Sequence, residues 1–509
     1  MKKVLLSMAV ASALLASDSA TEELRSEIEA LKKELAGIKK TIKKARLSSM
    51  KKQLKELKIE TKNDNIKFNV DFRSSVDSIR YKRANGQVEK NNAFLTNKLL
   101  LDMKYKPLDN LVFLGQLGYY KAFGDSADHS QGNNPMNSGY ADFDWITNES
   151  ALDNTLKLKQ AYFVYFGKDF LSSPVNWTAS VGRRPSTLGF PSYLRADNAR
   201  PQSPVGHAID VEFDGASFKF DLDRVTGVSG MYFKLCMGRG LTNAKPRFDF
   251  SGAEYVEDKA KNPDIDMVGF IFQPIDDGQY KAMIQVSKAM NLIGYTDKQL
   301  DNFDMVDMGI DPVTNTQFDP IMKSNYQMSY APSFKDVGNM YLGSAAFMVN
   351  GIGDMINDFL DDTKLFASVA YSKTEPNRGK VMLGSSEKES GHSIYLGAQI
   401  PTMLADGKIG FEYNKGSKYW RSMTYGEDTA IGSKLSTRGD AYEVYYNQPI
   451  LDKILSMQIR YTYLDYKYTG SNSFFGAEGK PMSMKEAQES GANPVESAQD
   501  LRLYFRYKY

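Results

Sequence analysis

The sequence predicts an all-β transmembrane barrel of about 16 antiparallel strands, preceded by a periplasmic α-helical coiled coil. Three observations predict this class. The chain begins with an apparent export signal, no later segment holds about 18 consecutive apolar residues, and the last segment alternates apolar and polar side chains. Thirty tyrosines and 28 phenylalanines accompany a single cysteine, so an intramolecular disulfide is excluded and stability must come from packing and a backbone ladder.

Residues 1–20 have the plan of a secretory signal peptide. Lys2 and Lys3 precede an apolar run from Val4 to Ala16, and small residues follow. An N-terminal anchor or a buried helix is the alternative, but the run is too short to span a bilayer. We expect cleavage between Ala16 and Ala20, with no lipid anchor because no cysteine lies there.

Residues 21–60 contain no proline and one glycine, and their apolar residues follow a heptad pattern. A narrow stripe of this kind cannot bury itself alone, which favours a coiled coil over a single amphipathic helix with a broader apolar face. We expect a homotrimer, because a barrel tethered to a coiled coil repeats around its axis. The second half is basic and is interpreted as a solvated face, with a polyanion or lipid headgroup partner as the alternative. The predicted seam consists of Leu24, Ile28, Leu31, Leu35, Ile38 and Ile42.

From residue 65 to residue 509 the apolar period changes from that of a helix to that of a strand, as in Ile66, Phe68, Val70 and Phe72. Sixteen strands make a barrel wide enough for an aqueous lumen. The predicted strands are residues 65–81, 94–106, 111–123, 155–166, 175–184, 207–222, 230–239, 264–273, 280–290, 338–349, 363–372, 391–400, 407–415, 438–448, 453–468 and 498–509.

The sixth predicted strand admits a second interpretation. Asp214 and Gly215 could form a hairpin turn between two short strands, because the apolar face changes phase there. One extra residue in a β-bulge would produce the same change. A single bulged strand keeps short and long connections alternating along the whole chain and keeps the strand number even, so we predict one strand. The segment after Gly351 is the longest short connection and is predicted to contain one helical turn.

The third long connection opens with two adjacent arginines and is expected to fold into the lumen and set a constriction. Opposed cations and carboxylates would produce a transverse field that selects solutes by charge. The alternative, compatible with the first, is that these groups pair only to fasten the loop. The candidate residues are Arg183, Arg184, Arg195, Arg200, Asp210, Glu212 and Asp214.

The sequence offers no enzyme signature. His129, His207 and His392 lie in separate contexts without metal-ligand spacing, and the adjacent His392 and Ser393 are best explained by chance. No cofactor or metal is expected. The fifth long loop carries several aspartates between Asp301 and Asp319 that could hold calcium, but their spacing matches no EF-hand and favours a solvated acidic loop.

The last strand resembles the terminal strand by which bacterial outer-membrane proteins are recognised for insertion. Its apolar residues alternate with Arg502, Tyr504, Arg506 and Lys508. The barrel assembly machinery and outer-membrane lipid are therefore expected partners, and nucleic acid is not. The predicted insertion signal consists of Leu501, Leu503, Phe505, Tyr507 and Tyr509.

Three segments carry a family resemblance: LKLKQAYFVYFGK at 156–168, SVGRRPSTLGF at 180–190 and VEFDGASFKF at 211–220. With the order of signal, heptad helix and barrel, the chain resembles a functionally uncharacterised family of bacterial outer-membrane proteins of about 500 residues. More loosely it is similar to trimeric porins with an N-terminal periplasmic coiled coil. The resemblance implies an outer-membrane location and a barrel, but no solute.

These observations predict a porin that allows passive diffusion of small hydrophilic solutes through a loop-constricted pore. The alternative is a structural or adhesive outer-membrane protein whose coiled coil tethers the barrel to the cell wall or to a periplasmic partner. A membrane enzyme is the third and least supported class.

Overall fold

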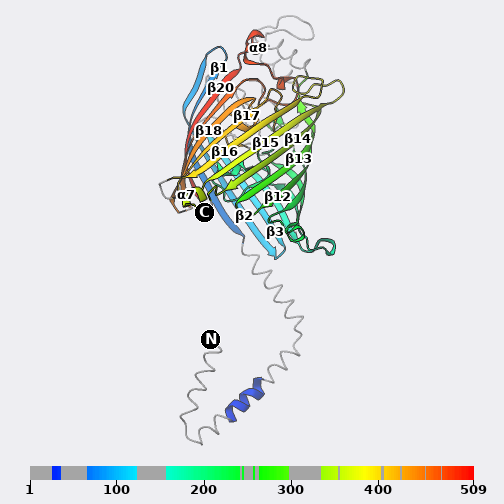
Figure 1. Cartoon of the computed structure of the whole chain (residues 1–509), viewed down its shortest axis with the longest axis vertical. Helices are drawn as coiled ribbons and strands as arrows, with labels where there is room; N and C mark the ends of the chain where they lie inside the picture. The colour runs from blue at the N-terminus through cyan, green and yellow to red at the C-terminus, as the bar shows by residue number, and fades with distance from the viewer. Residues whose placement is uncertain are drawn as a thin grey trace. The chain divides into compact units, whose positions relative to one another are not determined.

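The structure is a computed structural model of the 509-residue chain. It describes residues 26–35, 66–122, 156–240, 244–245, 256–257, 263–296, 334–353, 356–402, 406–424, 427–452, 454–471 and 473–509 (Figure 1). The predicted signal peptide, the acidic fifth loop and His129 lie outside these residues, as do Leu24, Ile38 and Ile42 of the predicted seam.

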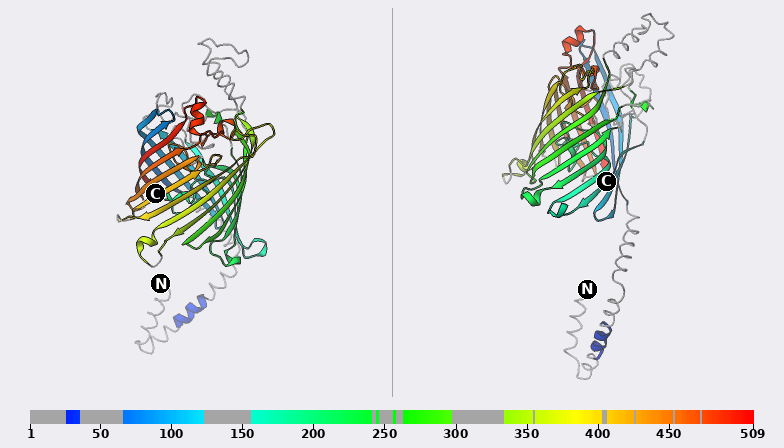
Figure 2. Two further views of the ribbon diagram at one scale, coloured as in Figure 1. Left: turned by 45° about the horizontal axis from the view of Figure 1, so that its top comes forward. Right: turned by 90° about the vertical axis from the view of Figure 1, so that its right-hand side faces the viewer.

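Sixteen antiparallel strands form one closed barrel, in which every strand pairs with its neighbours in chain order (Figures 1 and 2). Each predicted strand overlaps one of them, so the predicted fold class and strand number are confirmed. The barrel strands are β1 (Lys67–Arg83), β2 (Val88–Leu108), β3 (Leu111–Ala122), β4 (Lys157–Gly167), β5 (Asn176–Arg184), β8 (Phe213–Asp221), β9 (Tyr232–Gly240), β12 (Ile265–Asp276), β13 (Tyr280–Gly294), β14 (Lys335–Asn350), β15 (Lys364–Pro376), β16 (Ser390–Pro401), β17 (Lys408–Gly416), β18 (Gly439–Leu451), β19 (Leu455–Tyr466) and β20 (Val495–Lys508).

The first and last strands close the barrel. Phe72 of β1 lies opposite Tyr507 of β20, and the backbone N–H of Tyr509 donates to the carbonyl of Val70 at 2.9 Å. Along β20 the predicted alternation is present, because Leu501 and Phe505 are exposed on the outer face while Arg502 and Tyr504 are buried on the inner face. No strand edge is left open in this sheet.

The two faces of the wall differ in chemistry. On β15 the outward Leu365, Val369 and Tyr371 are exposed, whereas the inward Ser368 and Ser372 are almost fully buried. Other strands repeat the pattern, with Val286 and Phe347 exposed on β13 and β14. An apolar outer face and a polar inner face are the arrangement expected of a barrel that contacts lipid outside and water inside.

The sixth predicted strand needs a correction. Its barrel strand β8 begins at Phe213 rather than at residue 207, and it pairs with β5 in unbroken register from Arg184 opposite Phe213 to Asn176 opposite Asp221. The hairpin interpretation is therefore excluded, but the predicted bulge was wrong as well. Residues 207–212 are buried and belong to the third long loop, so the phase change arises because the chain reaches the wall only at Phe213.

Short elements occupy the connections. The predicted helical turn after Gly351 is present as α7. Within the third long loop, β6 and β7 form a small parallel pair around η3. The bounds of the short elements are η2 (Phe170–Ser172), β6 (Gly189–Phe190), η3 (Ser192–Leu194), β7 (Gln202–Val205), α4 (Asp223–Thr226), β10 (Ala244–Lys245), β11 (Val256–Glu257), α7 (Asp358–Asp361), η4 (Lys434–Ser436), η5 (Ala477–Gly479) and α8 (Met484–Glu489).

Residues 1–66 form a unit separate from the barrel. Its described part, residues 26–35, is helical, and the predicted seam residues Ile28, Leu31 and Leu35 are exposed there. The described residues therefore agree with a helix, while its association with other helices stays a prediction. No described helix is long and apolar enough to cross a membrane.

Candidate functional site

The third loop, residues 185–212, lies inside the barrel. The N–H of Val205 donates to Oε1 of Gln285 on β13 at 2.8 Å, and Nε2 of Gln458 on β19 donates to the carbonyl of Arg195 at 2.7 Å. Phe190 and Tyr193 of the loop pack with Phe366 and Tyr395 of β15 and β16. The loop thus reaches strands far from β5 and β8, between which it is inserted.

The seventh loop, residues 417–438, also enters the lumen. Trp420 is fully buried, and its Nε1 donates to the carbonyl of Leu435 at 2.7 Å. The two loops join directly, because the N–H of Asp210 donates to the carbonyl of Met423 at 2.7 Å and the N–H of Met423 donates to the carbonyl of Ala208 at 2.9 Å.

A buried network of six charged side chains fastens the two loops to the wall. Arg195 of the third loop contacts Glu427 of the seventh loop at 2.7 Å and Glu443 of β18 at 3.5 Å. Burial alone would lower the pKa of the Arg195 guanidinium, but Glu443 and Glu427 outweigh burial and hold that pKa well above its usual value. Lys434 of the seventh loop bridges Glu412 and Glu443. The network consists of Arg195, Lys434 and Arg460 with Glu412, Glu427 and Glu443.

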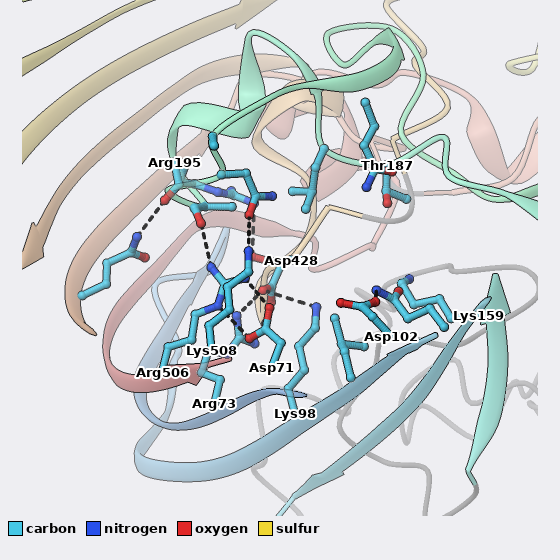
Figure 3. A pocket seen from close by; sticks show the side chains of 18 of the residues that line it. Asp71, Arg73, Lys98, Asp102, Lys159, Thr187, Arg195, Asp428, Arg506 and Lys508 are labelled. Carbon is cyan, nitrogen blue, oxygen red and sulfur yellow. Dashed lines mark hydrogen bonds and ion pairs between the residues drawn. The ribbon is translucent and has the colours of Figure 1, made fainter. Parts of the chain in front are cut away.

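Asp428, next to Glu427, faces the opposite side of the lumen. Its carboxylate accepts from Nη2 of Arg73 on β1 at 3.0 Å and from Nη1 of Arg502 on β20 at 3.1 Å, and Lys98 Nζ on β2 lies 3.7 Å away. Figure 3 shows Asp428 above Arg73 and Lys98. Burial alone would raise the pKa of Asp428, but Arg73, Lys98 and Arg502 outweigh burial and hold it well below its usual value.

A cavity of about 330 Å³, here named the first cavity, lies between the third loop and the wall formed by β1 to β4, β19 and β20 (Figure 3). Polar and charged side chains dominate its lining, so it suits water and hydrophilic solutes. Its charged lining residues are the cations Arg73, Lys98, Lys159, Arg195, Arg200, Arg460, Arg506 and Lys508 and the carboxylates Asp71, Asp102 and Asp428.

A second cavity of about 700 Å³ lies between the third loop and β4, β5, β8, β9 and β12 to β15. Ala199, Arg200 and Gln202 line both cavities, so the two adjoin along this segment of the third loop. The charged lining residues of the second cavity are the cations Arg184, Arg200, Lys219, Lys234, Lys281 and Lys364 and the carboxylates Asp221, Asp223 and Asp276.

The predicted constriction residues fall into three groups. Arg184, Arg195 and Arg200 line the cavities inside the barrel. Arg183 instead donates to Asp214 through Nε at 2.8 Å and Nη2 at 3.0 Å across β5 and β8, and neither residue lines these cavities.

The remaining two candidates, Asp210 and Glu212, are buried in the third loop. Glu212 pairs with Lys159 of β4 at 2.9 Å. Of the three acids expected to oppose the arginines, Asp214 is the partner of Arg183, while Glu427 and Glu443 lie beside Arg195.

A buried histidine joins the third loop to the wall. His207 contacts Ser368 Oγ through Nδ1 at 2.8 Å and Ser393 Oγ through Nε2 at 2.9 Å, and Ser393 Oγ donates to Asn414 Oδ1 at 2.9 Å. Because the Ser393 proton goes to Asn414, Nε2 of His207 must donate to Ser393 and cannot act as its base. Burial lowers the pKa of His207 to about 3, against a hydrogen-bonding effect of Asn414 that raises it.

This histidine therefore anchors the loop and does not activate Ser393. His392, adjacent to Ser393 in sequence, is exposed on the outer face of β16. Across the described ranges, no group of three or more histidine, cysteine, aspartate or glutamate side chains is arranged to hold a metal ion.

Sequence reasoning missed the seventh loop. Its residues Trp420, Arg421, Glu427, Lys434 and Arg438 are all nearly or fully buried, although the loop was expected only as an outer connection. A partial signal exists in the sequence. The loop contains one of the three tryptophans in the chain, and it also carries apolar residues between its charged ones. A loop that lies wholly in solvent does not need these apolar residues.

Together the closed wall and the inserted loops define a sixteen-stranded barrel whose lumen holds two loops and cavities with charged linings. The chain belongs to the family described as "Protein of unknown function (DUF3373)", which matches residues 88–509. Among curated proteins, no relative matches the sequence.

Several solved structures are similar to the chain at low sequence identity. OprB of Pseudomonas putida is 10% identical, with 88% of this chain and 96% of that chain covered and a TM-score of 0.46. OmpF of Salmonella typhi, in complex with daunomycin, is 10% identical, with 88% and 99% covered and a TM-score of 0.43. An anion-selective porin from Comamonas acidovorans is 10% identical, with 87% and 99% covered and a TM-score of 0.42.

Proposed function

We propose that the protein is an outer-membrane porin through which small hydrophilic solutes diffuse passively, and that it is not an enzyme. One observation carries the proposal. Two polar cavities of about 330 and 700 Å³ adjoin at Arg200 inside a closed barrel whose outer face is apolar. An apolar exterior suits lipid, and a polar interior beside a constricting loop suits hydrated solutes.

The third loop is the constricting element of this pore. It packs against β13, β15 and β16 through Phe190 and Val205, which leaves both cavities on the side of its Arg200. Hydrophobic contacts hold the loop against these strands, and its Arg200 borders the space that the two cavities leave open.

The chain is exported to the bacterial outer membrane, is inserted there by the barrel assembly machinery through the terminal strand, and is a homotrimer whose helix lies in the periplasm. The exposed apolar side chains of the described helix, Ile28, Leu31 and Leu35, support an association of helices. The outward Leu501, Phe505 and Tyr507 of β20 support insertion through that strand.

A second candidate function has an observation in its favour. A buried apolar cluster joins the third loop to the loops that carry Met382, Trp420 and Phe475, and packs them on β12 to β15. A barrel filled in this way would suit a structural or adhesive protein, with the coiled coil bridging to the cell wall or to a periplasmic partner.

Planar-bilayer recordings on purified full-length protein test the pore. Stepwise conductance is expected at low protein concentration, and its absence in clean, folded protein would overturn the porin proposal. Because a porin preparation can carry contaminating porins, a barrel variant with Arg200→Glu is recorded in parallel. A step size that differs from the wild type assigns the conductance to this protein.

Deletion of residues 21–60 separates the two functions. A pore is expected to keep single-channel conductance after the deletion, because both cavities lie within the barrel. A tether would lose attachment of the outer membrane to the cell wall, measured as increased release of outer-membrane vesicles. Vesicle release with no conductance in either form would favour the structural function.

A further inference from the structure

We infer that the pore prefers small inorganic anions over cations of similar size, an inference that rests on the porin proposal and names its solute class. The observation is a local charge imbalance. The whole chain is almost neutral, with 64 lysines and arginines against 62 aspartates and glutamates. The first cavity nevertheless has eight cationic lining residues against three carboxylates, and the second has six against three.

Most of the carboxylates in the first cavity are already neutralised. Asp428 is shared by Arg73, Lys98 and Arg502, and Asp71 accepts from Nε of Arg506 at 2.7 Å. The remaining carboxylate, Asp102, accepts from Gln116 Nε2 at 2.7 Å. A cation that enters this cavity therefore meets two carboxylates that already hold protein cations and only one, Asp102, that holds a neutral amide.

The second cavity has the same property. Asp221 pairs with Lys219 at 2.6 Å, and Asp276 pairs with Lys281 at 2.8 Å. Asp223 accepts from the backbone N–H of Arg224 at 2.8 Å. Two of its three carboxylates are thus bound to cations that line the same cavity.

Several cations, in contrast, have no carboxylate partner in the part of the chain that the structure describes. No ion pair there involves Arg184, Arg200 or Lys364. Lys234 donates to the neutral Ser203 Oγ at 2.6 Å, and Lys508 donates to the neutral Asn198 Oδ1 at 3.3 Å. These five positive charges are left to attract mobile ions.

Their placement extends the positive field along the path. Arg200 is exposed on the third loop and lines both cavities, while Lys508 lines the first cavity and Lys234 the second. Unpaired charges of one sign that line a space enclosed by a low-dielectric wall raise the local concentration of mobile ions of the opposite sign. This effect extends over about 10 Å at 0.1 M salt, so it weakens as salt rises.

The test is the reversal potential of the full-length protein in planar bilayers under a potassium chloride gradient. Chloride is expected to be several-fold more permeant than potassium in dilute salt, with a smaller ratio in concentrated salt. A wild-type pore that conducts but favours potassium, or neither ion, overturns the anion preference and leaves the porin proposal standing. No conductance at all overturns both.

Variants test which lining residues produce the preference for chloride over potassium. In the double variant Arg200→Gln and Lys234→Gln the chloride-to-potassium ratio is expected to fall at least about twofold, because two unpaired charges are lost. The matched control is Lys485→Gln on the exposed α8, which removes one charge outside both cavities and should leave the ratio unchanged.

An unchanged ratio in the double variant overturns the assignment to these cavities. If that variant does not fold, Lys508→Gln takes its place, because Lys508 is an unpaired lining cation of the first cavity. The salt dependence of the wild-type ratio tests the anion preference without any variant.

Discussion

Arg195 and Glu427 lie 232 residues apart in sequence, and Nη1 of the arginine contacts Oε1 of the glutamate at 2.7 Å in the barrel lumen. This contact joins the third loop to the seventh loop, and neither side chain is more than 3% exposed. Two inserted loops therefore share one buried ionic network. Disturbing the seventh loop should consequently change the position of the third loop and the cavities beside it.

Glu427→Gln should destabilise the barrel by about 3 kcal/mol, because a buried ion pair that loses one charge leaves the other without its counter-charge. Urea unfolding of the detergent-solubilised protein at neutral pH measures the change. The matched control is Glu387→Gln at an exposed position, expected to lie within about 0.5 kcal/mol of the wild type. Equal stabilities of the two variants would contradict a role for the Arg195 contact in holding the loops.

Asp428→Asn should raise the preference for chloride above that of the wild type. The amide has nearly the shape of the carboxylate but no charge, so Arg73, Lys98 and Arg502 lose the anion that they share. Reversal potentials under a potassium chloride gradient measure the effect, with Asp358→Asn on the exposed α7 as the control. A shift toward potassium would show that Asp428 does not offset the lining cations.

The wall of the barrel could be predicted from the sequence because period-two alternation follows directly from one lipid-facing and one lumen-facing side of each strand. The terminal strand, with Leu501 and Phe505 outside and Arg502 inside, shows the rule. The rule failed at Ile209 and Val211, which alternate like a strand but are buried in the third loop. Local alternation cannot separate a strand from an extended segment buried in the lumen.

The lining of the lumen was harder to predict because it depends on contacts between distant segments. Arg184, Arg195 and Arg200 line the cavities. The partner of Arg195 could not be predicted, since Glu427 belongs to a loop whose inward course has no periodic signal. Lys98 and Lys508, which lie near each other in the first cavity, are separated by almost the whole barrel sequence.

Gly391→Ala should displace the seventh loop. A β-carbon at Gly391 on β16 would lie 2.3 Å from the backbone nitrogen and Cα of Trp420, so the loop backbone must move. We expect a loss of about 1–3 kcal/mol in unfolding free energy and a more quenchable Trp420. Acrylamide quenching in a background with Trp145→Phe and Trp177→Phe isolates the signal. Gly343→Ala, whose β-carbon would meet its nearest atom at 3.9 Å, should leave quenching unchanged.

Glu478, in the connection between β19 and β20, should make the stability of the folded protein depend on pH. Burial raises the pKa of this carboxyl from 4.5 to about 7, although backbone hydrogen bonds such as that from Tyr295 N, at 3.0 Å, oppose the rise. The folded state therefore binds this proton more tightly than the unfolded state. The resulting stabilisation is complete below pH 4.5 and is lost as pH rises through about 7, a difference on the order of 3 kcal/mol.

Glu478→Gln keeps an acceptor for Tyr295 but carries no ionisable group, so its unfolding free energy should change less between pH 5 and pH 8 than that of the wild type. Urea unfolding at several pH values measures both proteins. Glu489→Gln on the exposed end of α8 is the control and should keep the wild-type pH profile. If Glu478→Gln also keeps that profile, the carboxyl titrates as it does in the unfolded chain, and burial beside Tyr295 does not hold its proton.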